Sequence, residues 1–569
     1  MPATPQTPTL PSRSSPGAAL LYAPDGYDTS RPKLMGRQAA GEGFLGGMVR
    51  HAGFDRLVAL TRNEADAAAF ARQVAAFDPA LPTEVILDRQ FHRLAEIGSL
   101  LLPGPGLGTH AWRRRRLDAA RGFSLIGLTH TTASAGAMDS ILDALVAPVQ
   151  EWDAIVCTSR AVQDAVRRQL EMQGAWLRDR LGATRIEGPS LPVIPLGVDC
   201  AAFALDAAAR AEWRARIEVT EQDVVVLHHG RLSFHAKAHP LPMLAGLGRA
   251  VAAAPAGARV VLVLSGWFAD DHQRRVFTEG AAALAPGVVL RIVDGRQPDV
   301  RRGIWQAADI FTLLSDNIQE TFGIAPVEAM AAGLPVVGTD WDGLRDTIVH
   351  GETGFLLPTI MAGPMADLAE RHDAGLDSYD SYIAGVAQFT AVDVPAAAEA
   401  FSALIADPAL RARMGAAGRR RARERFDWVQ VIGAWRALWE DLARLRQAAR
   451  TERAAPRRGE ERVPHRPDPS LLFAAYPTRR LAPEAVLALV PGEDAAAAMA
   501  RLRALVQLPG ALPRRELMPG MDAFEMVLGR LGQGPARVAE LVSELPPARA
   551  WRMQRALGWM LKVDLVRLD

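Results

Sequence analysis

The chain has 569 residues, of which 49% are hydrophobic and 23% are charged, and its formal net charge at pH 7 is +1. This length predicts about three or four globular domains of roughly 150 residues each. The near balance of charge gives no electrostatic reason to expect nucleic acid as a partner. With two cysteines, Cys157 and Cys200, the chain has no disulfide framework, which favours a reducing compartment.

The first 17 residues, MPATPQTPTLPSRSSPG, are rich in Pro, Ser and Thr and contain no apolar stretch behind a positively charged start. We interpret residues 1–17 as a disordered tail and neither as a secretory signal nor as a membrane anchor. No later stretch has the roughly 18 consecutive apolar residues of a membrane-spanning helix. We therefore expect a cytoplasmic protein without a transmembrane segment, whose only membrane contact would be peripheral, at the inner face.

Two arginine-rich runs, RRRR at 113–116 and RRRARER at 419–425, are the candidates for contact with anionic lipid. The simpler interpretation is that both runs form solvated helix faces.

From Ala18 onward, short apolar runs alternate with amphipathic segments whose apolar residues recur at three- and four-residue spacing. The predicted strands are 18–23, 56–61, 83–88, 123–130, 154–159 and 191–197. Alternation of strands and helices predicts a parallel sheet with helices on both faces.

The same pattern then begins again. The predicted strands of this second set are 224–230, 259–266, 288–295, 309–315 and 334–340. The fold class is therefore α/β with two Rossmann-like lobes, an N-terminal lobe over 18–205 and a C-terminal lobe over 206–427. The strongly amphipathic helix 428–447 is expected to complete the first lobe. Ligands of such sheets bind beyond the carboxyl ends of the strands, and a cleft between lobes is a favoured pocket.

The last part of the chain differs in composition. Residues 448–470 are charged and contain prolines without an apolar period, which predicts a linker. Residues 471–569 predict a separate, mainly helical module. Its end has a helix, a Pro-Pro break, a longer helix and a short apolar tail, an order that resembles a winged helix-turn-helix. Because such units often serve protein contacts, we expect a protein partner for this module and no nucleic acid.

The stretch ETFGIAPVEAMAAGLPVVGTD carries two acids, Glu320 and Glu328, where a strand passes into a buried helix. The helix is expected to begin near Phe322 or Gly323, so that the backbone N–H groups of Phe322, Gly323 and Ile324 can attract a phosphate. Glu328, about two turns into the helix, can accept hydrogen bonds from vicinal hydroxyls such as those of a ribose. Each glutamate alone is more often an ordinary loop or helix acid, but the combination suits a sugar nucleotide.

This stretch resembles the Glu-x7-Glu motif of retaining glycosyltransferases with the GT-B fold, family 4 in particular. That motif also has Phe-Gly after its first glutamate and Ala-x-Ala-x-Gly-x-Pro-Val-Val after its second. GLRDTIVHGETGFLLP (343–358) and VIPLGVDCAAF (193–203) are similar to two further segments of that family. The resemblance covers residues 120–445 well, 18–120 loosely and 450–569 not at all. It implies an enzyme that transfers a sugar from a nucleotide-sugar donor with retention of configuration, in the hexosyltransferase class.

The resemblance also implies a cationic pair after the first strand of the second lobe. HHGRLSFHAKAHP supplies Arg231 and Lys237, the latter one of only three lysines in the chain. Alanine at position 238 replaces the usual glycine of the family, so the path of this loop is expected to differ. In the family these cations neutralise the donor diphosphate and stabilise it as a leaving group. No metal and no other cofactor are then expected, since the cations and the helix turn supply the positive charge.

Two features of the first lobe are assigned to the acceptor side. Gly41, Gly43, Gly46 and Gly47 match the position of the family's glycine-rich acceptor-side or phosphate loop, although a glycine cluster alone is often a turn. His130 ends a predicted strand, where family members often carry a histidine that contacts the transferred sugar. A lone histidine at a strand end is more often structural.

The resulting hypothesis is a glycosyltransferase of polysaccharide biosynthesis, with Glu320 and His130 as its catalytic residues. The acceptor would be a glycan, lipid-linked or protein-linked, and the departing phosphate would take its proton, as the resemblance implies. Two alternatives remain open: a nucleotide-sugar epimerase of the same fold, and a non-catalytic scaffold that acts through its C-terminal module. Residues 359–392 are longer than is usual in the family and are interpreted as a lid or a partner contact.

Overall fold

The structure, a computed structural model, describes residues 17–28, 36–117, 119–453, 455, 460–512, 514–543 and 545–569. The predicted tail 1–17 lies outside these ranges apart from Gly17. The chain forms two compact units, Met1–Val463 and Pro464–Asp569. Among the helices of the described residues, none is long and apolar enough to cross a membrane.

The first lobe is built on a six-stranded parallel sheet with the strand order β3-β2-β1-β4-β5-β6. Its strands are β1 (Ala19–Leu21), β2 (Leu57–Thr61), β3 (Thr83–Leu87), β4 (Ser99–Leu101), β5 (Ser124–Leu128) and β6 (Ala154–Val156). In the register, Ala19 of the central strand pairs with Val58 on one side and Leu100 on the other. This is the Rossmann order, and the direction of winding reverses between β1 and β4.

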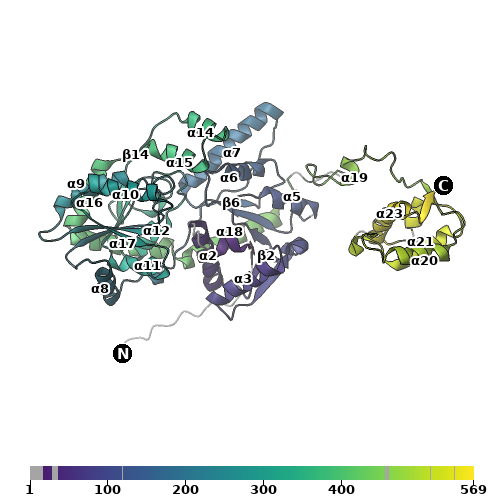
Figure 1. The fold of residues 1–569 in the computed structure, drawn as a ribbon, viewed down its shortest axis with the longest axis horizontal. Coiled ribbons are helices and arrows are strands. Elements are labelled where there is room, and N and C mark those ends of the chain that lie inside the picture. The colour runs from purple at the N-terminus through teal and green to yellow at the C-terminus, as the bar shows by residue number, and fades with distance from the viewer. Residues whose placement is uncertain are drawn as a thin grey trace. The chain divides into compact units, whose positions relative to one another are not determined.

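Helices cover both faces of this sheet. They are α1 (Pro24–Tyr27), α2 (Gly36–His51), α3 (Glu64–Phe77), α4 (Leu94–Ile97), α5 (Gly108–Arg116), α6 (Ala135–Leu142), α7 (Arg160–Leu181) and, from much later in the chain, α18 (Trp428–Ala448). Figure 1 shows α18, in green, among the purple helices of the first lobe. Its residues Trp428, Trp435 and Trp439 are buried in the same hydrophobic core as Leu20 and Phe44.

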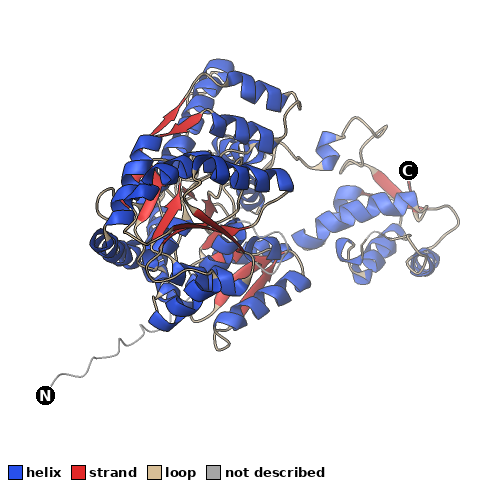
Figure 2. Cartoon of the chain, turned by 60° about the vertical axis from the view of Figure 1, so that its left-hand side comes forward, coloured by secondary structure: helices blue, strands red, loops and turns tan. Residues whose placement is uncertain are grey.

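The second lobe repeats the design with the order β12-β11-β10-β7-β8-β9, again entirely parallel. Its strands are β7 (Val224–His229), β8 (Val260–Gly266), β9 (Val289–Asp294), β10 (Ile310–Leu313), β11 (Val336–Thr339) and β12 (Gly354–Leu357). Its helices are α8 (Ala207–Arg216), α9 (Pro240–Ala250), α10 (Asp271–Leu284), α11 (Pro298–Gly303), α12 (Ile324–Ala331), α13 (Leu344–Thr347), α16 (Val394–Ala406) and α17 (Pro408–Arg425). Figure 2 shows the red strands enclosed by blue helices.

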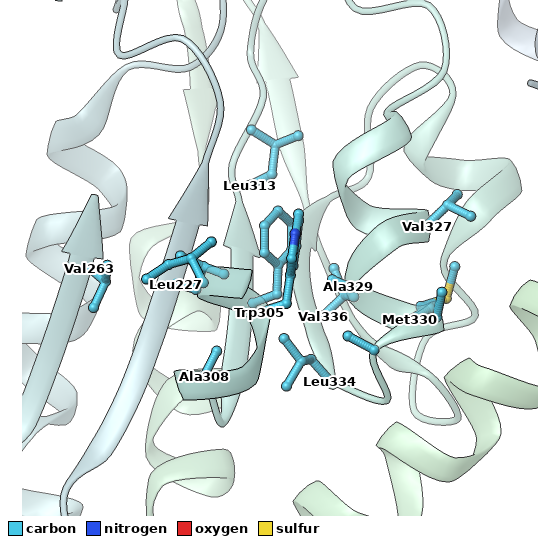
Figure 3. Packing of buried hydrophobic residues seen from close by; sticks show 14 of the residues in the cluster. Leu227, Val263, Trp305, Ala308, Leu313, Val327, Ala329, Met330, Leu334 and Val336 are labelled. Atoms are coloured by element: carbon cyan, nitrogen blue, oxygen red, sulfur yellow. The ribbon is translucent and has the colours of Figure 1, made fainter. Parts of the chain in front are cut away.

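The central strands of this lobe are formed by the apolar runs of the sequence, and their side chains make up its hydrophobic core. Leu227, Val263 and Leu313 from neighbouring strands belong to one buried cluster with Trp305 and with Met330 of α12 (Figure 3). All five side chains are 1% exposed or less. The predicted fold class, α/β with two Rossmann-like lobes, is confirmed.

Three details differ from the prediction. Residues 191–197 form no strand and make one isolated bridge, at Val193, because Pro192 and Pro195 lack the N–H groups that a ladder needs. The sheets contain two strands absent from the prediction, β4 and β12, each of four residues or fewer. Such short strands carry too little sequence pattern to be seen.

The segment 359–392 folds as an excursion from the second lobe. It contains β13 (Thr359–Met361), α14 (Ala366–Asp373), α15 (Tyr379–Gln388) and β14 (Thr390–Val392). The two strands pair antiparallel, so the segment leaves and returns at one place.

The unit Pro464–Asp569 is mainly helical, as predicted, and has a core of its own that includes Leu487, Phe524, Leu557 and Met560. Its elements are α19 (Pro469–Leu472), β15 (Val486–Leu489), α20 (Ala495–Leu505), α21 (Met521–Leu531), β16 (Ala536–Arg537), α22 (Val538–Ser543), α23 (Pro547–Lys562) and β17 (Val566–Leu568). The apolar tail that the sequence shows after the long helix is β17, which pairs antiparallel with β15 in the sheet β16-β15-β17.

The chain crosses between the two lobes at two places that lie side by side. The backbone N–H of Val198 donates to the carbonyl of Phe426 (2.8 Å), and the N–H of Trp428 donates to the carbonyl of Val198 (3.3 Å). These two crossings form one narrow hinge.

Candidate active site

The candidate site lies where the winding of the second sheet reverses. β7 and β10 are hydrogen-bonded neighbours there, and their carboxyl ends open onto the crevice in which ligands of such sheets bind. We call residues 230–239, which follow β7, the cation loop, and residues 314–323, which follow β10, the acid loop.

The acid loop holds the cation loop in place through its side chains. The hydroxyl of Ser315 donates to the backbone carbonyl of Lys237 (3.1 Å), and the side-chain amide of Asn317 donates to the backbone carbonyl of His235. Both side chains are fully buried. The sequence prediction gave them no role, although three polar residues directly after a buried strand were the available signal.

Asp316, between them, is 2% exposed and accepts a hydrogen bond from the backbone N–H of His239 (3.3 Å). Burial raises the pKa of this carboxyl to about 7, against the lowering effect of that N–H. Asp316 therefore joins the end of the cation loop to the end of β10.

The structure brings the predicted cations and the first predicted acid together. Lys237 Nζ forms an ion pair with Glu320 Oε2, and the two side chains are 23% and 10% exposed. The Arg231 guanidinium donates to the carbonyl of Ala236 (3.3 Å). Burial lowers the pKa of Arg231, while the nearby carboxylates of Asp380 and Glu320 oppose that change. Two cations and one acid are thus grouped beyond the carboxyl ends of β7 and β10.

The predicted phosphate-binding turn lies at the start of α12. The helix begins at Ile324, one or two residues later than predicted, and Gly323 precedes it with a left-handed φ of +87° that only glycine adopts readily. The ring of Phe322 is buried against Phe426 at 5.8 Å between centroids. Only the backbone of Phe322, and not its side chain, is therefore available to a ligand.

Glu328 lies further along α12 and is electrostatically connected to the same group. Burial raises its pKa to about 7, and the positive charges of Arg301 and Lys237 act in the opposite direction. At pH 7 the Glu328 carboxyl is therefore neutral or half-ionised. A ligand that donates hydrogen bonds to its carboxylate would favour the ionised form.

His130 belongs to the first lobe, at the end of β5. It lines a mostly apolar pocket together with Tyr27, Gly41, Leu102 and Trp428. This pocket lies where β1 and β4 end, which is the point at which the winding of the first sheet reverses. The backbone carbonyl of His130 accepts a hydrogen bond from the hydroxyl of Thr321, the residue after Glu320 (3.3 Å). The two lobes therefore meet beside the first acid.

The four predicted loop glycines lie inside helix α2 instead of a loop. A Cβ at Gly43 or Gly47 would lie 3.1 or 2.7 Å from the ring of Trp428, and one at Gly46 would lie 3.0 Å from the ring of Phe77. These glycines allow close helix packing, a requirement that a local sequence pattern does not distinguish from phosphate binding. Gly41 alone lines the pocket.

A search for metal ligands covers only the residues that the structure describes. Among them, no group of three or more His, Cys, Asp or Glu side chains is arranged to hold a metal ion.

The part of the chain around this site is similar to a known family. Residues 209–371 match the family Glycosyl transferases group 1. The matched segment contains Arg231, Lys237, Glu320 and Glu328.

Among curated relatives, the phosphatidyl-myo-inositol mannosyltransferase of Mycolicibacterium smegmatis is 30% identical over 254 residues, which is 44% of this chain and 56% of that protein. The D-inositol 3-phosphate glycosyltransferase of Xylanimonas cellulosilytica is 29% identical over 266 residues, 45% of this chain and 52% of that protein. The chain thus spans about half the length of these relatives. The crystal structure of Anabaena HepE in complex with UDP and glucose superposes with a TM-score of 0.46 at 18% identity, covering 74% of this chain and 99% of that one.

Proposed function

We propose that this protein is a glycosyltransferase that moves a sugar from a nucleotide-sugar donor to an acceptor with retention of configuration, as in family 4. The observation that supports this function best is the group formed by Arg231, Lys237, Glu320 and Glu328 at the reversal point of the second sheet. Two cations suit a diphosphate, and two acids suit sugar hydroxyls on either side of it.

The donor would lie mainly on the second lobe. Arg231, Lys237 and the backbone N–H groups of residues 322–324 would bind the diphosphate, and Glu328 would accept hydrogen bonds from the ribose. Lys237 is paired with Glu320 in the free protein, so a bound phosphate would share its ammonium group. Positive charge would then already be in place where negative charge develops on the leaving phosphate.

Glu320 would lie beside the transferred sugar, with His130 facing it from the first lobe. Attack and departure on one face would give retention, with the departing phosphate accepting the proton of the acceptor hydroxyl. Because Arg231 and Lys237 supply the positive charge, we also propose that transfer needs no metal. Chelation with EDTA is accordingly expected to leave the rate unchanged.

The acceptor would enter through the pocket that His130 lines. It would be a glycan, either lipid-linked or protein-linked. The two relatives described above act, by name, on an inositol phosphate and on phosphatidyl-myo-inositol. We therefore include inositol phosphate and phosphatidylinositol among the acceptors to be tested beside oligosaccharides.

The deciding experiment is a panel of UDP-, GDP- and ADP-linked sugars, measured first as a shift of the thermal midpoint and then as sugar transfer. One donor class is expected to raise the midpoint, since a ligand that binds only the folded state stabilises it. Lys237→Met is expected to abolish that shift, whereas Lys562→Met, a lysine of the C-terminal unit, keeps it. No shift with any donor would contradict the proposal. Product analysis separates transfer from epimerisation of the free nucleotide sugar.

For the molecule as a whole, we propose a cytoplasmic enzyme of polysaccharide biosynthesis whose C-terminal unit binds a protein partner. Fractionation of cells into soluble, peripheral and integral membrane pools tests the location, and affinity capture with residues 464–569 tests the partner.

A further inference from the structure

Beside the candidate site, one short segment of the first lobe is bound to the second lobe by side chains. We call this set of contacts the latch. It consists of Thr158, Ser159 and Arg160 from the first lobe and Thr321, Asp342 and Asp346 from the second.

The first contact of the latch is an ion pair at the start of α7. Asp346 accepts hydrogen bonds from both the backbone N–H and the Nε of Arg160, each at 2.6 Å. Its carboxylate also faces the positive end of the 22-residue helix α7. Within the second lobe, the Arg421 guanidinium donates to the backbone carbonyls of Asp346 (2.7 Å) and Thr347 (2.8 Å), and these bonds hold α13 against α17.

The second contact passes through the residue that caps α7. The hydroxyl of Ser159 accepts a hydrogen bond from the N–H of Val162 (3.2 Å) and donates to Asp342 Oδ1 (3.2 Å). The side chain of Ser159 therefore both caps the start of α7 and binds the other lobe.

Asp342 is held in an unfavourable state by this arrangement. Its φ is +41°, in the left-handed region that non-glycine residues rarely adopt. Burial raises its pKa to about 7, and the charge of Glu320 adds to that effect. The hydroxyl of Ser159, the N–H of Gly343 and the charge of Arg345 act in the opposite direction. Backbone strain and desolvation thus coincide at one residue whose partner comes from the other lobe.

The third contact reaches the candidate catalytic residues. The hydroxyl of Thr158 donates to the carbonyl of Thr321 (3.2 Å), and the hydroxyl of Thr321 donates to the carbonyl of His130 (3.3 Å). The residue next to Glu320 is therefore bonded to the first lobe on both sides.

We propose that the latch is a positioning device that closes the two lobes and sets the separation of His130 and Glu320, and so of acceptor and donor. The proposal rests on the proposed function, because it gives those two residues a shared reaction. The hinge formed by residues 198 and 426–428 joins the lobes through backbone hydrogen bonds, and the latch adds side-chain contacts beside the candidate site, so that the two together hold the lobes at one separation.

The protonation of Asp342 makes closure of the lobes depend on pH. An aspartate has a pKa of 3.8 before any shift, and Asp342 has one of about 7 in the closed structure. Opening of the lobes exposes Asp342 to water and so lowers its pKa from this value, which means that the closed form binds the proton more tightly and closure is favoured at low pH. As pH rises toward about 7, the ratio of closed to open molecules falls, and above about pH 7 it levels off.

The test measures the distance between the lobes in the full chain. Spin labels at Ala165→Cys on α7 and Glu352→Cys on the second lobe, both exposed, report on closure, since the native Cys157 and Cys200 are buried. We expect a short distance in the wild type at about pH 5.5 and a growing long-distance population toward about pH 8. Asp346→Asn and Arg160→Ala are expected to populate the long distance at both pH values.

Asp342→Asn separates the titration from the contact. Asparagine tolerates a positive φ and keeps an oxygen for the Ser159 hydroxyl, so this variant is expected to stay closed with no pH dependence. Asp294→Asn is the matched control, because Asp294 pairs with Arg296 of its own lobe and takes no part in the latch. Arg167→Ala is the control for Arg160→Ala, because Arg167 pairs with Asp164 within α7.

Kinetics then test positioning against a merely structural role. Asp346→Asn is expected to lower kcat for transfer about tenfold or more while the Kd for UDP or GDP, whichever binds, changes less than twofold. Equal distances and equal kcat in wild type and Asp346→Asn would overturn the latch. A wild type that is inactive with every donor would instead contradict the proposed function, while the distances would still show whether the latch closes the lobes.

Discussion

At the scale of single residues, burial and pairing decide which charged side chains of this protein are accessible to other molecules. The arginine run 113–116 illustrates this. Arg114 is fully buried and paired with Asp153 through two hydrogen bonds of 2.8 and 2.6 Å, while Arg113 is paired with Asp88 at the surface. Arg114 is therefore part of the interior of the first lobe and does not belong to a solvated or lipid-contacting face of this run.

The pair of Arg114 and Asp153 allows a prediction about stability. Asp153 also accepts hydrogen bonds from the backbone N–H groups of Leu125 (2.8 Å) and Gln150 (2.7 Å). Asp153→Ala would leave a buried arginine without its counter-ion, and we expect a loss of about 3–5 kcal/mol in the free energy of unfolding. Asp164→Ala, at an exposed ion pair, is expected to change it by less than about 1 kcal/mol in the same denaturant titration.

A second prediction at this scale concerns Glu328. Its pKa of about 7 in the free protein means that a ligand that needs the carboxylate must displace a proton below that pH. Affinity for the nucleotide is therefore expected to rise with pH up to about 7 and then to level off. Calorimetric titration of UDP or GDP across this range checks it. Glu328→Gln should bind more weakly and without this pH dependence, and an unchanged pH profile in that variant would rule out the assigned role.

At the scale of elements, two loops and two helices matter most. The acid loop supports the cation loop through Ser315, Asp316 and Asn317, so the position of Lys237 depends on these three residues. Helix α18 packs on α2 only because glycines of α2 leave room for the ring of Trp428.

The acid loop gives a prediction about ligand binding. Asn317→Ala would leave the carbonyl of His235 without its buried donor and would loosen the cation loop. We expect nucleotide affinity to fall about tenfold, with a loss of about 1–3 kcal/mol in the free energy of unfolding of the free protein. The comparison variant is Gln319→Ala, in the same loop, whose backbone N–H bonds to Asn317 while its side chain is not needed for that bond. Equal losses in the two variants would contradict the assignment.

Packing of α2 against α18 gives a prediction with an internal control. In Gly47→Ala the new methyl group would lie 2.7 Å from the Trp428 ring, and overpacking of this kind costs about 1–3 kcal/mol. In Gly433→Ala, within α18, no heavy atom lies within 4 Å of the new methyl group. That change should stabilise by about 0.5–1 kcal/mol, because alanine loses less backbone entropy in a helix than glycine. Opposite shifts of the thermal midpoint are the expected result.

At the scale of the whole molecule, the chain is divided into units that bury their own cores. The two lobes of Met1–Val463 share a hinge and the latch, whereas Pro464–Asp569 has a separate core with Leu557, Met560 and Phe524 at its centre. We expect residues 464–569 expressed alone to unfold cooperatively, and residues 1–463 to retain nucleotide binding. Calorimetry of the full chain should then resolve two transitions. A fragment 464–569 without a cooperative transition would show that this unit needs the rest of the chain.

The sequence by itself determined the fold class and singled out the charged residues that the structure brings together at the carboxyl ends of β7 and β10. Buried parallel strands and amphipathic helices have local patterns, and residues 320–328 carry two acids and a glycine at fixed spacing within one short segment. The positions of Arg231, Lys237 and Glu320 beside one another follow from that pattern once the carboxyl ends of two neighbouring strands meet.

Only the tertiary structure decided what depends on partners far apart in the chain. The glycines of α2 needed the ring of Trp428, some 380 residues away, before their packing role was visible. The prolines near 191–197 left an apolar run without a ladder. The contacts of Ser159 with Asp342 and of Arg160 with Asp346 join residues about 180 positions apart, and no local pattern encodes such a pair. Burial and charge state arise from the assembled fold, because they depend on which distant side chains exclude water from a group.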